Sequence, residues 1–162
     1  MKGLVLAGGF GTRLRPLTYT GAKQLIPVAN KPILFYVLEN LTAAGIADIG
    51  IVVGETKKEI IEQVGDGSKF GVKITYIEQE APLGLAHAIK VARPFLQDSN
   101  FIMYLGDNLL KENIKGLIER FEKNRPNGTV LLTRVKNPQE FGVAIVDDDG
   151  RPCTLPTYRL VG

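Results

Sequence analysis

Short apolar runs alternate with amphipathic stretches along this 162-residue chain, and that alternation restricts the fold to the α/β class. The runs GLVLA, IGIVV and FIMYL, at 3–7, 49–53 and 101–105, are continuously apolar, which is typical of parallel strands covered on both faces. An alternating pattern predicts another strand at 72–77, and 129–135 and 143–146 also look like strands. We therefore expect an α/β fold with a mostly parallel sheet.

The segments between these strands carry helical signals. Pro32 and Gly45 have the residue types that begin and end a helix. Thr56 and Glu59 form a capping-box pattern at the start of a second helix. Apolar residues at helical spacing predict two more helices, at 83–96 and at 110–121.

Composition excludes several classes of protein. Hydrophobic residues make up 44% and charged residues 23% of the chain, as in an ordinary globular domain. A single cysteine cannot form an internal disulfide, and no apolar run approaches the ~20 residues of a membrane span. The first residues lack the long apolar core of a signal peptide, so we expect a cytoplasmic protein without membrane contact. A net charge of +3 gives no argument for nucleic-acid binding.

The charges are unevenly distributed along the chain. The first 38 residues contain five bases and no acid, whereas the rest holds 15 bases and all 17 acids. The five bases are Lys2, Arg13, Arg15, Lys23 and Lys31. Such a bias arises by chance in short segments, or it marks a site for an anionic ligand.

A glycine-rich loop, GGFGTRLRP, follows the first predicted strand at 8–16. Glycines at such a place let backbone N–H groups approach a phosphate. A Walker A loop is excluded because Thr12 and Arg13 follow Gly11, and a dinucleotide fingerprint fails because Leu14 replaces its last glycine. A NAD-dependent oxidoreductase is therefore a weak alternative, and a plain glycine turn beside solvated arginines stays open.

The complete string GGFGTRLRPLT, followed by KQLIPVANKPIL, resembles the opening of the sugar-phosphate nucleotidyltransferases. Together with the later LGDN at 105–108, it is most similar to the glucose-1-phosphate thymidylyltransferases. The resemblance implies a Rossmann-like three-layer sandwich of the nucleotide-diphospho-sugar transferase type. It also implies a Mg²⁺-dependent reaction of dTTP or UTP with glucose 1-phosphate, which yields the corresponding nucleotide-sugar (dTDP-glucose from dTTP) and pyrophosphate, and which supplies polysaccharide synthesis.

The resemblance also assigns roles to individual residues. Arg13 and Lys23 would neutralise the phosphates during catalysis, as a bidentate guanidinium and a point-charge ammonium can. The residues expected to bind the nucleotide are Gly8, Gly9, Gly11, Thr12, Gln24, Gln79 and Gly84. Gln79 and Gly84 would read the edge of the pyrimidine, because an amide pairs with one donor and one acceptor of thymine or uracil.

The remaining roles fall at the end of the 101–105 strand and beyond. Asp107 would bind the metal, and Leu105, Asn108 and Gly142 would line the sugar-phosphate pocket. A strand-end aspartate also caps turns, so that alternative stays open. Without a second ligand at suitable spacing, His87 is expected to be a surface or packing residue, and 147–150 is expected to be a hairpin turn.

The resemblance ends near residue 150. We therefore expect a nucleotidyltransferase domain at 1–150 and an atypical tail at 151–162, as in a C-terminally truncated member of the family. The family's Glu-Lys-Pro motif and second metal-binding aspartate have no counterpart in the sequence. An alternative is therefore a catalytically impaired, nucleotide-binding homologue with a binding or regulatory role. A sheet cut short has an exposed edge, which favours a homo-oligomer.

Overall fold

The computed structural model describes residues 1–9, 21–137, 139, 143–148 and 152–154. The chain divides into two compact units, Met1–Lys123 and Asn124–Gly162, and each is described by itself. The boundary predicted after residue 150 stays a prediction.

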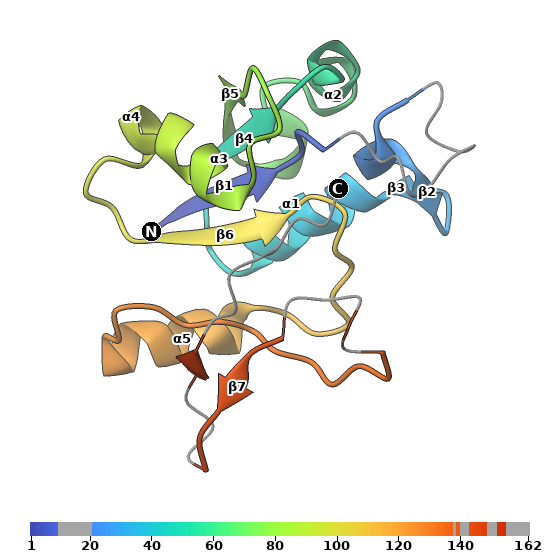
Figure 1. Cartoon of the computed structure of the whole chain (residues 1–162). Helices are drawn as coiled ribbons and strands as arrows, with labels where there is room; N and C mark the ends of the chain where they lie inside the picture. Colours follow the sequence, from blue (N-terminus) through green and yellow to red (C-terminus); the bar gives the residue numbers. More distant parts are fainter. Residues whose placement is uncertain (10–20, 138, 140–142, 149–151, 155–162) are drawn as a thin grey trace. The chain divides into compact units, whose positions relative to one another are not determined.

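A four-stranded parallel sheet forms the centre of the first unit (Figure 1). Its strands lie in the order β5-β4-β1-β6, with β1 at Lys2–Leu6, β4 at Asp48–Val53, β5 at Lys73–Glu78 and β6 at Phe101–Leu105. Val5 of β1 is in register with Ile51 of β4 on one side and with Tyr104 of β6 on the other. The predicted α/β class with a parallel sheet is confirmed.

Helices lie between the strands of this sheet and after its last strand in the chain, β6. The α-helices are α1 (Ile33–Ala43), α2 (Lys57–Val64), α3 (Leu85–Val91), α4 (Arg93–Leu96) and α5 (Lys115–Asn124). Shorter elements are the 3₁₀ helices η2 (Lys23–Leu25) and η3 (Ser68–Phe70) and the hairpin of β2 (Pro27–Val28) and β3 (Lys31–Pro32).

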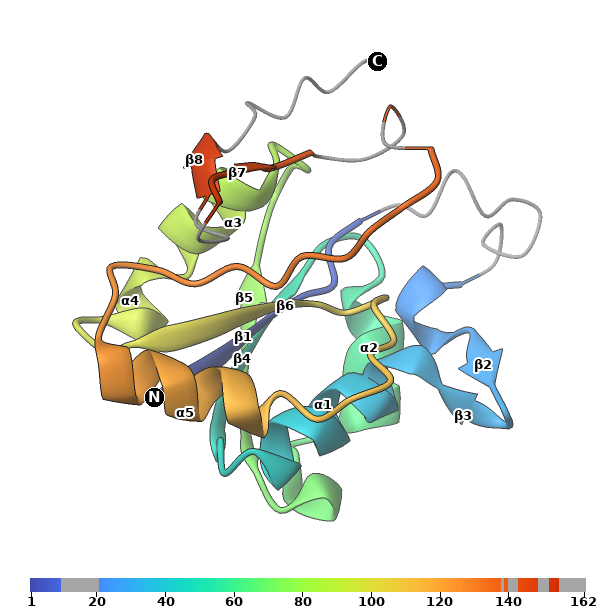
Figure 2. The same cartoon turned by 90° about the horizontal axis from the view of Figure 1, so that it is seen from below.

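Each face of the sheet has its own hydrophobic cluster, so the first unit has three layers. Val5 points to the cluster that contains Leu38 of α1 and Ile60 of α2. Its neighbour Leu4 points to the other cluster, with Ala88 of α3. Figure 1 shows α3 and α4 on one side of β1 and β6 and α1 on the other, and Figure 2 shows the same layers from below. In the two central strands, β1 and β4, the side chains of Leu4, Val5, Ile51 and Val52 are fully buried, which explains their continuous apolar runs.

The strand order changes direction at β1. From β1 the chain adds β4 and then β5 on one side, and it returns through α3 and α4 to place β6 on the other side. In open parallel sheets, ligands bind outside the carboxyl ends of the strands at such a switch point. The loops that follow β1 and β6 are therefore where a ligand site is expected.

Two predicted helices have different bounds in the structure. The helix expected at 83–96 is divided into α3 and α4, because Pro94 has no N–H to continue the ladder begun in α3. The helix expected at 110–121 begins at Lys115. Asn113 Oδ1 accepts a hydrogen bond from Lys115 N, while Asn40 Oδ1 accepts one from Ile114 N. These two bonds satisfy backbone donors at the helix start, where the helix itself offers no acceptor.

The capping box predicted at Thr56 and Glu59 is wrong. Thr56 precedes α2 but makes no side-chain cap hydrogen bond. Glu59 Oε2 instead accepts a hydrogen bond of 2.8 Å from Ala22 N, which lies 37 residues earlier. The Glu59 carboxylate therefore makes a tertiary hydrogen bond instead of the local one that the capping-box pattern predicts at the start of α2.

The second unit contains a small antiparallel pair, β7 (Ile145–Val146) and β8 (Pro152–Thr154). This pairing agrees with a hairpin turn between the two strands, although 149 and 150 lie outside the described residues. The strand predicted at 129–135 is wrong, because this segment is irregular and no described strand pairs with it. Its large apolar side chains are 39–55% exposed.

Within the described ranges, no helix is long and apolar enough to cross a membrane.

Candidate functional site

Loops at the carboxyl ends of β1, β5 and β6 carry most of the site residues predicted from the sequence. Gly8 and Gly9 follow β1, Gln79 follows β5, and Leu105 is the last residue of β6. Asp107 and Asn108 come next, in a turn in which Asn108 N donates to Leu105 O. Because the strands are parallel, all of these loops emerge at the same edge of the sheet.

Lys23 and Asp107 form an ion pair at this edge. Lys23 lies in η2, and its Nζ donates to Asp107 Oδ2 at 2.5 Å across 84 residues of sequence. The two side chains are 23% and 29% exposed, so the pair is partly shielded from water. Gly9 lies beside the same lysine, since a Cβ built at Gly9 would be 3.4 Å from Lys23 Cε. The loops after β1 and β6 thus meet at one cation and one carboxylate.

Gln24, the next residue of η2, is 1% exposed. Its Oε1 is buried and receives no hydrogen bond from any described residue. Gly106 packs against this side chain, because a Cβ there would be 3.3 Å from Gln24 Cγ and 3.0 Å from Leu6 O. A buried acceptor without a donor costs roughly 1–3 kcal/mol, so this oxygen favours the approach of a ligand that donates to it.

Gln79 is the second buried polar side chain, at 9% exposure. Its backbone N donates to Val53 O, which fixes it beside the end of β4. Its Oε1 lies beside Gly8, where a Cβ would come within 3.3 Å of that oxygen. Its Nε2 is 3.4 Å from the carbonyl oxygen of Gly84, which precedes α3 with a φ of +94°. That backbone conformation requires a glycine, so Gly84 is structurally suited to its place.

A hollow of about 540 Å³ adjoins Gln79. It is bounded by Gly54 at the end of β4 and by the ion pair between Lys57 of α2 and Glu78 of β5, whose charged atoms are 2.6 Å apart. Gln79 is therefore one of the residues that line a hollow at this edge of the sheet.

Two contacts of the site were not anticipated from the sequence. Glu59 of α2 accepts a hydrogen bond from Ala22 N, and Ala22 immediately precedes Lys23 and Gln24. His87 of α3 places its Nδ1 3.0 Å from Gln79 Nε2, although the sequence indicated a surface or packing role. No local pattern reports either contact, because each joins segments that meet through the fold.

Gly11, Thr12, Arg13 and Gly142 lie outside the described residues, so their predicted roles stay predictions. Among the described residues, the structure brings Lys23, Gln24 and Asp107 together, and it places Gln79 beside Gly8 and Gly84.

The residues present fit a divalent cation that arrives with phosphates. The described part of the chain has no group of three or more histidine, cysteine or acidic residues that could together hold a metal ion. Asp107 offers one carboxylate that already accepts a cation, the Lys23 ammonium. Mg²⁺ is commonly held by one or two carboxylates together with substrate phosphates, so Asp107 suits a metal–nucleotide complex better than a free ion.

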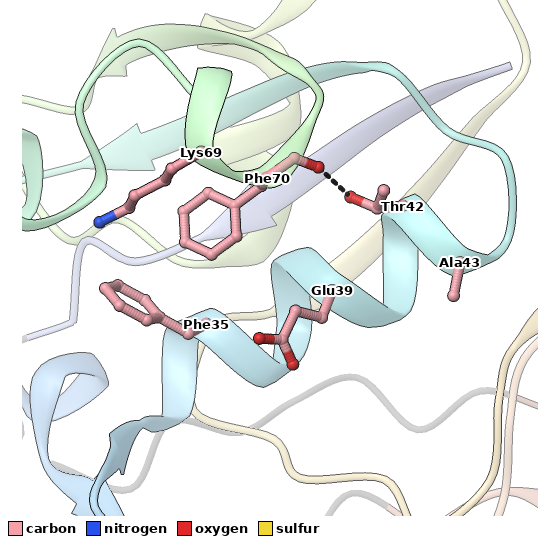
Figure 3. Close-up of a pocket in the computed structure, with 6 residues that line it drawn as sticks. All are labelled: Phe35, Glu39, Thr42, Ala43, Lys69 and Phe70. Atoms are coloured by element: carbon pink, nitrogen blue, oxygen red, sulfur yellow. Dashed lines mark hydrogen bonds between the residues drawn. The ribbon is translucent and has the colours of Figure 1, made fainter.

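A second hollow, of about 470 Å³, lies between α1 and η3 (Figure 3). Phe35 and Phe70 meet edge to face at 5.0 Å, and the Lys69 ammonium is 4.3 Å from the centre of the Phe35 ring. Thr42 Oγ1 donates to Phe70 O and ties η3 to α1. None of the predicted site residues lines this hollow, and we interpret it as a packing junction.

Comparison with known proteins identifies the family. A family model described as nucleotidyl transferase matches residues 2–155. The chain belongs to the nucleotidyl transferase family. This nucleotidyl transferase chain is 59% identical over 152 residues to a glucose-1-phosphate thymidylyltransferase of Streptomyces antibioticus. It is also 54% identical over 156 residues to a nucleotidyltransferase of low-salt glycan biosynthesis from Haloferax volcanii.

The alignments cover 93% and 96% of this nucleotidyl transferase chain but only 43% and 44% of those two relatives. The chain thus spans less than half the length of these two curated relatives. A solved structure from Bacillus anthracis, assigned as a glucose-1-phosphate thymidylyltransferase and determined with sucrose, superposes with a TM-score of 0.87 at 34% identity. That match covers 91% of this chain and 61% of the other.

A UDP-glucose pyrophosphorylase structure has a TM-score of 0.66 at 24% identity, and this likeness supports the fold alone. The sequence resemblance to the nucleotidyltransferases and the expected nucleotide-diphospho-sugar transferase fold are confirmed.

Proposed function

We propose that this chain provides the nucleotide-binding part of a glucose-1-phosphate thymidylyltransferase. The reaction couples dTTP, or UTP, with glucose 1-phosphate and yields the nucleotide-sugar and pyrophosphate. The observation that carries the proposal is the meeting of Lys23, Gln24 and Asp107 at the switch point of the sheet. The supporting similarity is 59% identity to a protein of that name.

In this reaction a phosphate oxygen of glucose 1-phosphate attacks the α-phosphorus of the nucleotide. A bond forms between them, the bond from the α-phosphorus to the bridging oxygen breaks, and pyrophosphate leaves. Such a transfer depends mainly on in-line positioning and neutralisation of negative charge. Lys23 brings an ammonium beside Gly9, near the start of the glycine-rich loop after β1, and Arg13 would add a bidentate guanidinium.

Asp107 would hold Mg²⁺ together with the phosphates, and the metal supplies charge neutralisation when it is bound. In the ligand-free chain, Lys23 occupies that carboxylate. The two residues therefore neutralise each other until a nucleotide binds, when Lys23 would contact a phosphate and Asp107 would contact Mg²⁺.

Two further groups suit a nucleoside triphosphate. The unpaired Gln24 Oε1 accepts a hydrogen bond from a donor on the nucleotide, and its deep burial limits the size of the group that reaches it. Gln79 reads the pyrimidine edge from the end of β5, next to Gly8. Leu105 and Asn108 would line the sugar-phosphate pocket with Gly142. The expected cytoplasmic location and homo-oligomeric state remain part of the proposal.

The experiment measures pyrophosphate release from dTTP, Mg²⁺ and glucose 1-phosphate, beside calorimetric binding of dTTP to the same sample. Release well above a control without sugar supports the proposed activity, and replacing dTTP by UTP ranks the two nucleotides. Binding without release would favour the alternative of a nucleotide-binding homologue, which agrees with a chain that spans 43% of its relative. Absence of both binding and release would contradict the proposal.

A further inference from the structure

His87 of α3 contacts the buried amide of Gln79 from the side away from Gly8. Its Nδ1 lies 3.0 Å from Gln79 Nε2. An amide nitrogen is a donor only, so Nδ1 is the acceptor in this contact. The imidazole thus contacts the nitrogen end of the amide.

The second N–H of the same amide is directed to protein as well. Gln79 Nε2 lies 3.4 Å from Gly84 O, at the start of the helix that carries His87. Both donors of the amide thus have acceptors on α3 and on Gly84, the residue that precedes this helix. Turning the amide over would place Oε1 against the Gly84 carbonyl oxygen, and two acceptors that face each other are electrostatically unfavourable.

The carbonyl end of the amide is left for a ligand. Oε1 lies beside Gly8, where the missing side chain leaves room, and no residue of the described part donates a hydrogen bond to it. The site therefore presents an acceptor at this point rather than the acceptor and donor together that the sequence suggested.

We propose that His87 is a positioning residue that holds the Gln79 amide with its oxygen toward the nucleotide, and so selects bases with an N–H at that edge. Thymine and uracil carry such an N–H at N3, whereas cytosine has a lone pair there. The inference rests on the proposed nucleotide function. It deepens that function by assigning the preference for thymine and uracil over cytosine to a pair of residues.

The experiment compares dissociation constants for dTTP and dCTP, both with Mg²⁺, in the wild type and in three variants. His87→Leu removes the acceptor, and we expect it to lower the preference for dTTP by about tenfold, as the loss of one oriented hydrogen bond would. His87→Asn keeps an acceptor oxygen near the position of Nδ1 and should retain most of the preference. Gln79→Leu should abolish the preference.

A matched control comes from the same helix. Lys90→Leu adds the same apolar side chain on α3, at an exposed position, and should leave the preference at the wild-type value. Melting temperatures of all variants check that each is folded.

The outcomes separate this proposal from the function on which it rests. A wild type that binds neither nucleotide overturns the proposed function and this inference together. Wild-type selectivity that Gln79→Leu abolishes and His87→Leu leaves intact overturns the role of His87 alone. Equal loss of selectivity in His87→Leu and His87→Asn also contradicts positioning by an acceptor atom.

Discussion

Lys23 and Asp107, which are 84 residues apart in sequence, join the loops after β1 and β6 through a contact of 2.5 Å between Nζ and Oδ2. Neither side chain is more than 29% exposed. A phosphate that binds the ammonium, or a metal that binds the carboxylate, competes with this pair. The contact therefore couples the two halves of the proposed site in the ligand-free chain.

Asp107→Asn tests the carboxylate. An amide oxygen is a weaker ligand for Mg²⁺ than a carboxylate, while Lys23 becomes available to phosphate. We expect dTTP binding without Mg²⁺ to be unchanged or tighter, and the strengthening by Mg²⁺ to fall about tenfold. Calorimetry with and without the metal measures both. Equal weakening under the two conditions would instead indicate a structural role for Asp107.

Lys23→Met tests the ammonium. The loss of a charge-assisted hydrogen bond to phosphate should weaken dTTP binding about 10- to 100-fold, and thymidine binding much less. Lys115→Met is the matched control, because Lys115 is 67% exposed and forms a distant 4.0 Å pair with Glu119. Comparable losses for dTTP and for thymidine would remove Lys23 from the phosphate site.

Glu59 fixes the segment that carries Lys23 and Gln24, through its bond to Ala22 N. Glu59→Leu leaves that backbone donor without its acceptor, so we expect a stability loss of about 1 kcal/mol and several-fold weaker dTTP binding. Glu59→Gln retains an acceptor and should resemble the wild type. Glu62→Leu, at an exposed position of α2, provides the control. Denaturant unfolding and calorimetry would measure the two effects, and a Glu59→Leu variant that binds like Glu62→Leu would disprove the anchoring role.

Much of the sheet was predictable because buried parallel strands require continuous apolar runs, which 3–7, 49–53 and 101–105 show directly. Boundaries failed where tertiary contacts replaced local ones. Asn40 Oδ1 of α1 accepts a hydrogen bond from Ile114 N, and α5 begins at the next residue, Lys115, rather than at residue 110. The run at 129–135 has strand composition, but no described strand pairs with it.

The site residues likewise fall into those that the sequence could predict and those that it could not. Gly8, Lys23 and Asp107 belong to motifs whose residue types reflect their chemistry, so a resemblance could name them. His87 and Glu59 act through contacts with Gln79 and with Ala22 N, which are set by how α3 and α2 pack. A single sequence contains no signal for such contacts, because a helix pattern fixes which face is apolar but not what a polar side chain meets.

Gly50 and Gly116 give opposite predictions for the same substitution. A Cβ at Gly50 of β4 would lie 2.8 Å from the Phe95 ring and 2.9 Å from Ile77 Cδ1, inside the cluster under α3 and α4. Gly50→Ala should therefore lower the free energy of unfolding by about 1–3 kcal/mol. Gly116 of α5 has nothing within 4 Å of that position, and Gly116→Ala should raise it by about 0.5 kcal/mol. Urea unfolding of the two variants checks both signs, and a neutral Gly50→Ala would contradict the close packing of Phe95 on β4.

Tyr76 of β5 makes the free energy of unfolding depend on pH in the alkaline range. Burial, and then the negative charge of Asp66, raise the pKa of Tyr76 to about 12 from 10.0. Its hydroxyl donates to Gly65 O at 2.6 Å, a bond that requires the protonated form. The unfolded chain releases this proton first, so the stabilisation is complete below pH 10 and is lost as the pH rises from 10 toward about 12.

Tyr76→Phe tests this dependence. We expect the variant to be less stable than the wild type at pH 8, because it lacks the hydrogen bond, and the difference to shrink as the pH rises above 10. Urea unfolding at several pH values measures the difference, and the near-ultraviolet absorbance of tyrosinate follows the ionisation itself. Parallel pH curves for the two proteins would show that Tyr76 ionises alike in the folded and the unfolded chain.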